Sequence, residues 1–122
     1  MQFNKDNLRV FKTAQKIYFN DDFFYVRKWT AKERLDYWKR IETYDTEKDK
    51  IYELSNDIMT YVIQKSLCNQ DSELIYTESE TKEIELIDGE LLEAIYDAAM
   101  IHNGLKDGSL KTEIKNSETA PS

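Results

Sequence analysis

The pattern of hydrophobic and polar residues is typical of strands near the N-terminus and of helices over most of the chain that follows. The runs Lys16–Phe19 and Phe23–Trp29 are rich in aromatic and β-branched residues, which favour strands. The polar run Asn20–Asp22 between them is typical of a turn. We therefore predict a β-hairpin over about residues 16–29, packed on the helices because an isolated hairpin is only marginally stable.

A first helix is predicted directly after the hairpin. Thr30 and Glu33 have the spacing of a capping box, in which each side chain accepts a hydrogen bond from the backbone N–H of the other residue. The helix that follows carries Leu35, Trp38 and Ile41 on one stripe, and an apolar stripe normally faces the core. We therefore expect Trp38 to be at least partly buried.

Further helices follow in the second half of the chain. A long one is predicted over about residues 47–67, where apolar residues recur at helical spacing without Gly or Pro. Thr77 and Glu80 form a second capping box, for a short acidic helix. Asp88 caps a last helix that ends at Asn103-Gly104, since Gly adopts the left-handed conformation at little cost. The prediction is a mainly α (α+β) fold, an N-terminal β-hairpin followed by three to four helices.

Length and composition indicate one domain with a polar extension. The chain has 122 residues, of which 40% are hydrophobic, enough for a single modest core. Residues 106–122 contain only Leu110 and Ile114 as large apolar residues, too few to order the segment. We predict a single domain over residues 1–105 and a flexible C-terminal tail over residues 106–122.

Charge is distributed unevenly along the chain, whose formal net charge is −7. Residues 24–40 carry six basic and two acidic side chains, whereas residues 71–97 carry ten acidic side chains and one lysine. The two stretches could attract each other within a molecule or between copies, or both could be solvated faces. The net acidity disfavours nucleic-acid binding, which depends on clustered Lys and Arg.

Catalytic and metal-binding chemistry has little support in the sequence. Cys68 and His102 are the only residues of their types, which excludes an intramolecular disulfide and a thiolate zinc cluster. Carboxylate pairs such as Glu90 and Glu93 lie at predicted helix starts, where the helix dipole explains them. No run of about eighteen apolar residues suggests a membrane span. We predict no enzyme activity, no cofactor, no metal and no membrane association.

Aromatic and basic residues alternate where the predicted hairpin meets the first helix. Such residues bind single-stranded nucleic acid or form protein interfaces, and the acidic net charge favours a protein. The candidate protein-interaction residues are Tyr25, Arg27, Trp29, Arg34 and Trp38.

Three segments, in order, resemble the tail assembly chaperones of long-tailed (siphovirus-type) bacteriophages and prophages. Phe24–Arg34 is similar to their segment leading into the first helix: tyrosine-valine-arginine, two residues, threonine, two residues, glutamate-arginine. Ser66–Tyr76 resembles their second recurring segment, although the family usually has Gly where Ser72 stands. Ile87–Leu105 is similar to their final helix with its Asn-Gly stop.

The resemblance implies a non-enzymatic role in tail morphogenesis. Such chaperones bind the tape-measure protein, help to recruit tail tube protein subunits and associate with themselves. They act in the host cell cytoplasm and are absent from the mature virion, and many are made in two lengths by a programmed frameshift. The acidic stretch 71–97 leaves an alternative open: a small regulatory protein of a mobile element that acts as a nucleic-acid mimic.

Overall fold

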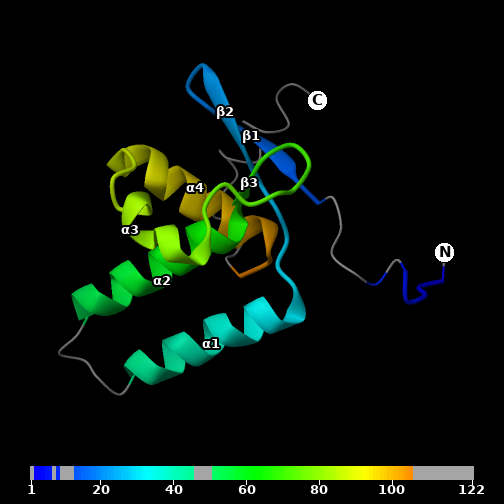
Figure 1. Ribbon diagram of the computed structural model, residues 1–122, viewed down its shortest axis with the longest axis horizontal. Coiled ribbons are helices and arrows are strands. Elements are labelled where there is room, and N and C mark those ends of the chain that lie inside the picture. Colours follow the sequence, from blue (N-terminus) through cyan, green and yellow to red (C-terminus); the bar gives the residue numbers. More distant parts are fainter. Residues whose placement is uncertain (1, 7, 9–12, 46–50, 106–122) are drawn as a thin grey trace.

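The computed structural model describes residues 2–6, 8, 13–45 and 51–105, which form a small antiparallel sheet packed on helices (Figure 1). In chain order the elements are β1 (Gln15–Phe19), β2 (Asp22–Val26), α1 (Ala31–Asp45), α2 (Ile51–Ser66), β3 (Leu67–Cys68), the 3₁₀ helix η2 (Glu78–Glu80), α3 (Thr81–Ile84) and α4 (Gly89–His102). The predicted fold, a hairpin followed by helices, is confirmed. The predicted flexible tail, 106–122, lies outside the described residues.

The hairpin pairs β1 with β2 in antiparallel register, with Ile17 opposite Phe24. In the turn between the strands Asn20 has φ +56°, a left-handed conformation that Asn tolerates better than most residues. Val26, at the end of β2, is fully buried. The second strand ends at Val26 rather than at Trp29, so the chain leaves the sheet before it reaches α1.

The third strand, β3, is not predicted by the sequence pattern. Leu67 pairs with Val26 in antiparallel register, and Cys68 pairs with the residue before Val26. Two residues directly after a helix have no periodicity of their own to detect. Their strand geometry depends on β2, a partner far away in sequence, and the pairing attaches the end of α2 to the hairpin.

The predicted caps begin the helices. At α1, the Thr30 N–H donates to Glu33 Oε1 (2.9 Å) and the Glu33 N–H donates to Thr30 Oγ1 (3.2 Å). At η2, the Thr77 N–H donates to Glu80 Oε1 (2.8 Å). At α4, Asp88 Oδ2 accepts from the N–H three residues on (3.0 Å). All three predictions are confirmed. Such caps can be predicted because they depend on residues close together in sequence.

The core lies between the sheet, α2 and α4, and α1 packs on α2 (Figure 1). Contacts run from α1 to α2, from α2 to α4 and from α4 to the hairpin. The fully buried apolar side chains come from β2, α2, α3 and α4: Val26, Val62, Ile63, Ile84 and Ala99. The hairpin and α1 therefore lie on opposite sides of the α2–α4 pair.

The stripe predicted to bury α1 is wrong. Leu35 and Trp38 are 68% and 47% exposed, and of the three stripe residues only Ile41 packs against the core. The buried face is centred instead on Tyr37, whose ring centroid lies 5.3 Å from that of Trp29. The pattern misleads because, besides Ile41, this side of α1 uses amphipathic side chains such as Arg34 and Arg40, whose guanidinium groups donate to the Asn103 carbonyl and to Asp57 Oδ1.

Asn103, just after α4, joins three parts of the fold. Its Oδ1 accepts a hydrogen bond from the Trp29 N–H at 2.7 Å. Its Nδ2 donates to the carbonyl oxygens of Arg27 (3.3 Å) and Ala99 (3.0 Å). Its own carbonyl accepts from Arg34 Nη1 at 2.6 Å. This buried amide fixes the chain between β2 and α1 to the end of α4.

Two turns contain residues with positive φ that bear on the sequence motifs. Gly104 has φ +69°, so the predicted Asn-Gly helix stop is confirmed. Ser72, in the turn after β3, has φ +67°, a conformation that disfavours an L side chain by about 1–2 kcal/mol. Its hydroxyl accepts from the Ala14 N–H at 2.9 Å. Gly is the residue best suited to this φ.

The Asn103 junction makes a prediction about stability. Asn103→Ala removes three side-chain hydrogen bonds and leaves the buried Trp29 N–H without its partner. We expect a loss of about 3 kcal/mol in the free energy of unfolding, measured by urea denaturation. Asn56→Ala, at an exposed position of α2, is the matched control and should cost less than about 0.5 kcal/mol. Equal stability of the two variants would contradict the junction.

The Ser72 turn makes a second prediction. Ser72→Ala and Ser72→Gly both lose the hydroxyl that binds Ala14, but only Gly relieves the positive φ. Ser72→Gly should therefore be more stable than Ser72→Ala by about 1 kcal/mol. At Ser79, in the 3₁₀ helix η2, the order should reverse because Gly weakens a helix. Thermal unfolding of the four variants checks this, and Ala above Gly at residue 72 would refute it.

Candidate functional site

The five predicted interaction residues do not lie on one surface. Arg27 and Trp29 are buried, with 9% and 6% of their surface exposed. Tyr25 and Arg34 are half-buried, and Trp38 is exposed. The prediction of a shared exposed surface is therefore wrong for Arg27 and Trp29, which are unavailable to a partner.

Arg27 holds the end of the hairpin against α1. Its Nη2 pairs with Glu33 Oε2 at 2.8 Å, and its Nη1 donates to the Lys28 carbonyl at 3.3 Å. Its backbone N–H donates to the Ser66 carbonyl at 3.0 Å. Glu33 thus caps α1 with one carboxylate oxygen and pairs with Arg27 through the other. A partly buried ion pair of this kind positions elements of the fold.

Trp29 belongs to the aromatic core beneath α1. Its indole Nε1 donates to Ser66 Oγ at 2.7 Å, and its ring packs on Tyr37 and on Tyr61 at centroid distances of 5.3 and 6.0 Å. Burial raises the pKa of each tyrosine to about 12. The Tyr61 hydroxyl donates to the Glu33 carbonyl at 2.7 Å, which places this cluster at the start of α1.

The single cysteine is buried, and the single histidine lies next to a backbone carbonyl group. Cys68 is buried, and burial raises the pKa of its thiol to about 11, so the thiolate is scarce at neutral pH. His102 Nε2 lies 3.1 Å from the Thr13 carbonyl oxygen. Within residues 2–6, 8, 13–45 and 51–105, no three His, Cys, Asp or Glu residues are grouped so as to hold a metal ion. No helix in that part of the chain is long and apolar enough to cross a membrane.

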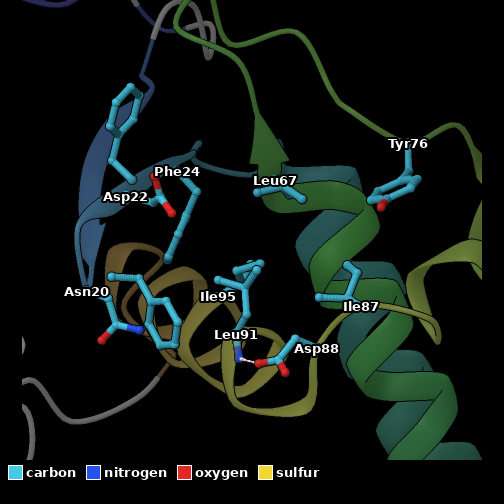
Figure 2. A pocket seen from close by; sticks show the side chains of 11 residues that line it. Asn20, Asp22, Phe24, Leu67, Tyr76, Ile87, Asp88, Leu91 and Ile95 are labelled. Atoms are coloured by element: carbon cyan, nitrogen blue, oxygen red, sulfur yellow. Dashed lines mark hydrogen bonds between the residues drawn. The ribbon is translucent and has the colours of Figure 1, made fainter.

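An apolar groove of about 420 Å³ lies between the hairpin and α4, and we call it the hairpin–α4 groove (Figure 2). In Figure 2 the hairpin forms one wall and α4 forms the floor, and Leu67 of β3 lies across from the hairpin. Its apolar lining includes Phe23, Phe24, Leu67, Tyr76, Leu91 and Ile95. A concave apolar surface of this size is suited to bulky apolar side chains.

The polar groups of the hairpin–α4 groove are acidic or neutral. Asp22 and Asp88 line it together with Asn20, and none of its lining residues is basic. Asp21, next to Asp22 in the hairpin turn, is exposed. Asp88 already accepts one hydrogen bond, from the Leu91 N–H (Figure 2). The groove therefore favours an apolar group that carries a positive charge beside it.

The opposite side of the molecule presents a second apolar surface, the α1 outer face: Lys32, Leu35, Trp38 and Lys39. Leu35 and Trp38 are three residues apart, so they lie on the same side of the helix. Both are exposed, as are the two lysines. Of the five predicted interaction residues, Trp38 is the one whose side chain is exposed.

Sequence reasoning misses the hairpin–α4 groove. Its walls come from segments far apart in the chain, and each wall residue individually fits a strand or helix position. A weak signal exists in the adjacent pairs Phe23-Phe24 and Leu91-Leu92. Adjacent residues of a strand or helix point in different directions, so only one residue of each pair is needed for a single buried face. The other apolar residue of the pair is the weak signal.

Comparisons of the chain with protein-family models, with curated proteins and with solved structures find no match. The candidate sites therefore rest on the geometry of the molecule itself.

The two tryptophans provide a matched test of burial. Trp29→Ala removes a buried ring from the core and should cost about 3–5 kcal/mol in the free energy of unfolding. Trp38→Ala should cost less, about 1 kcal/mol, because about half of the residue is already exposed. Guanidinium denaturation followed by circular dichroism measures both. A cost at Trp38 as large as that at Trp29 would place Trp38 in the core after all.

Proposed function

We propose that this chain is a tail assembly chaperone of a long-tailed bacteriophage or prophage. It is a non-enzymatic protein that binds the tape-measure protein, helps to recruit tail tube subunits and associates with itself. It acts in the host cell cytoplasm and is absent from the mature virion. The resemblance of three ordered segments supports this proposal, and the positive φ of Ser72, at the family's Gly position, agrees with the alignment of the second segment.

The observation that carries the proposal is the hairpin–α4 groove. It combines an apolar lining with two carboxylates and no base, so it suits an amphipathic client segment with basic residues beside its apolar side chains. An assembly chaperone must cover such segments until the client is packed. In this proposal the groove is the site for the tape-measure protein.

The acidic residues support one alternative function. Eight of the ten carboxylates in residues 71–97 are exposed; Glu80 and Asp97 are half-buried. An exposed array of carboxylates is the feature that a nucleic-acid mimic needs. The two functions differ in the position of the gene. A chaperone gene lies between the tail tube gene and a very long tape-measure gene.

Client binding is tested by co-expression with a tape-measure protein, which the proposal expects to be encoded by a very long gene next to that of this chain. Asp21→Lys/Asp22→Lys reverses the charge beside the groove, and we expect the amount of co-purified tape-measure protein to fall at least about tenfold, the equivalent of about 1.4 kcal/mol. Asp71→Lys/Glu93→Lys makes the same change in net charge at exposed positions that do not line the groove, and it should retain the client.

Four outcomes would count against this assignment. A tape-measure protein that stays soluble without the chain, or that fails to co-purify with the unaltered chain, overturns the chaperone proposal. Equal loss of client with both double variants would assign binding to net charge rather than to the groove. Displacement of DNA from a DNA-binding protein by the chain, in the absence of client binding, would support the mimic.

A further inference from the structure

The hairpin–α4 groove and the α1 outer face are complementary in chemistry. The groove is apolar with Asp22 and Asp88 in its lining. The α1 outer face presents Leu35 and Trp38, the latter 47% exposed, between the exposed lysines 32 and 39. A large aromatic side chain flanked by cations is the kind of anchor that an apolar pocket with an acidic margin accepts.

The charged groups at the edges of the two surfaces have few strong partners within the molecule, which favours docking. The Lys32 Nζ lies 3.5 Å from Asp36 Oδ2, but this pair is exposed on the helix surface, and such pairs contribute little. Within the part of the chain that the structure describes, Lys39 and the carboxylates of Asp21 and Asp22 form no ion pair. Docking would therefore bring opposite charges together at a low cost in broken interactions.

The two surfaces of one molecule cannot meet. α1 packs on α2, α2 packs on α4, and α4 packs on the hairpin. In Figure 1 the hairpin lies at the upper edge and α1 at the lower edge, with α2 and α4 between them. An α1 outer face that enters a groove must therefore come from another molecule.

We propose that the α1 outer face of one copy docks in the hairpin–α4 groove of a second copy, so that self-association covers the groove and competes with the client. This inference rests on the proposed function for the identity of the client, and the docking itself rests on the two surfaces. The groove of each docked copy would thus be covered by its neighbour until a client binds. A client with a stronger apolar and basic segment would displace the neighbouring copy.

The contact is heterologous, because it joins two different surfaces. Each copy keeps one free groove or one free α1 outer face after docking, so copies add head to tail into chains or rings. The assembly should also weaken with increasing salt, since part of the attraction is between charges close to the solvent.

The first test measures the mass of the full chain by sedimentation equilibrium, without any client. We expect the unaltered chain to form species larger than a dimer as its concentration rises. Leu35→Gln/Trp38→Ala, which lacks the α1 anchor, and Asp21→Lys/Asp22→Lys, which reverses the charge on the hairpin side of the groove, should each remain monomeric. Leu86→Gln, at another exposed apolar position, is the control and should assemble normally. Circular dichroism checks that all variants are folded.

Mixing the two defective variants tests the direction of docking. One variant retains its groove and the other retains its α1 outer face, so together they should form a dimer and nothing larger. A monomeric unaltered chain at every concentration, assembly that survives both double variants, or a mixture that stays monomeric would each overturn the proposal.

Competition separates this inference from the chaperone function. Leu35→Gln/Trp38→Ala should bind the tape-measure protein at least as well as the unaltered chain, because its groove is uncovered. If this variant loses the client, the α1 outer face is a client site and the competition is refuted. If head-to-tail assembly occurs but no tape-measure protein binds, the docking stands and the proposed client fails.

Discussion

The side-chain amide of Asn103 is the interaction on which the arrangement of the molecule depends. The chain between β2 and α1 has no regular secondary structure, so its buried backbone groups need partners from elsewhere. Asn103 supplies them for the Trp29 N–H and the Arg27 carbonyl. Because Asn103 also caps α4, the hairpin is attached to α4 where the chain leaves the sheet. The groove between these two elements includes Asp88, at the other end of α4.

Local signals explain why much of the fold could be predicted. The Thr30–Glu33 box, the Asp88 cap and the turn at Asn20 each depend on residues within a few positions of one another. The sequence therefore shows where these helices and the hairpin begin. β3 could not be found in this way, because Leu67 is extended only through its pairing with Val26, and nothing near Leu67 in sequence indicates that partner.

The candidate site was harder to predict because side-chain burial is decided by distant partners. Arg27 resembles a surface residue in the sequence, yet its side chain is buried where its guanidinium pairs with the Glu33 carboxylate and donates to the Lys28 carbonyl. Leu35 resembles a core residue, yet α1 turns its Tyr37 side inward because that ring completes the cluster around Trp29. The groove is a property of the packed hairpin and α4, so it is visible only once their relative positions are known.

The position of Cys68 gives the molecule a built-in reporter of its own opening. The thiol lies in the short strand β3, between β2 and the bridging residue Leu74, and it is the one cysteine of the chain. A thiol reagent therefore reaches Cys68 when the strands of the sheet separate. While the strands are paired, the thiol is buried and the reagent cannot reach it. The rate of labelling follows the population of the open state. Thiol labelling therefore measures how often the sheet opens, in a protein that carries no added probe.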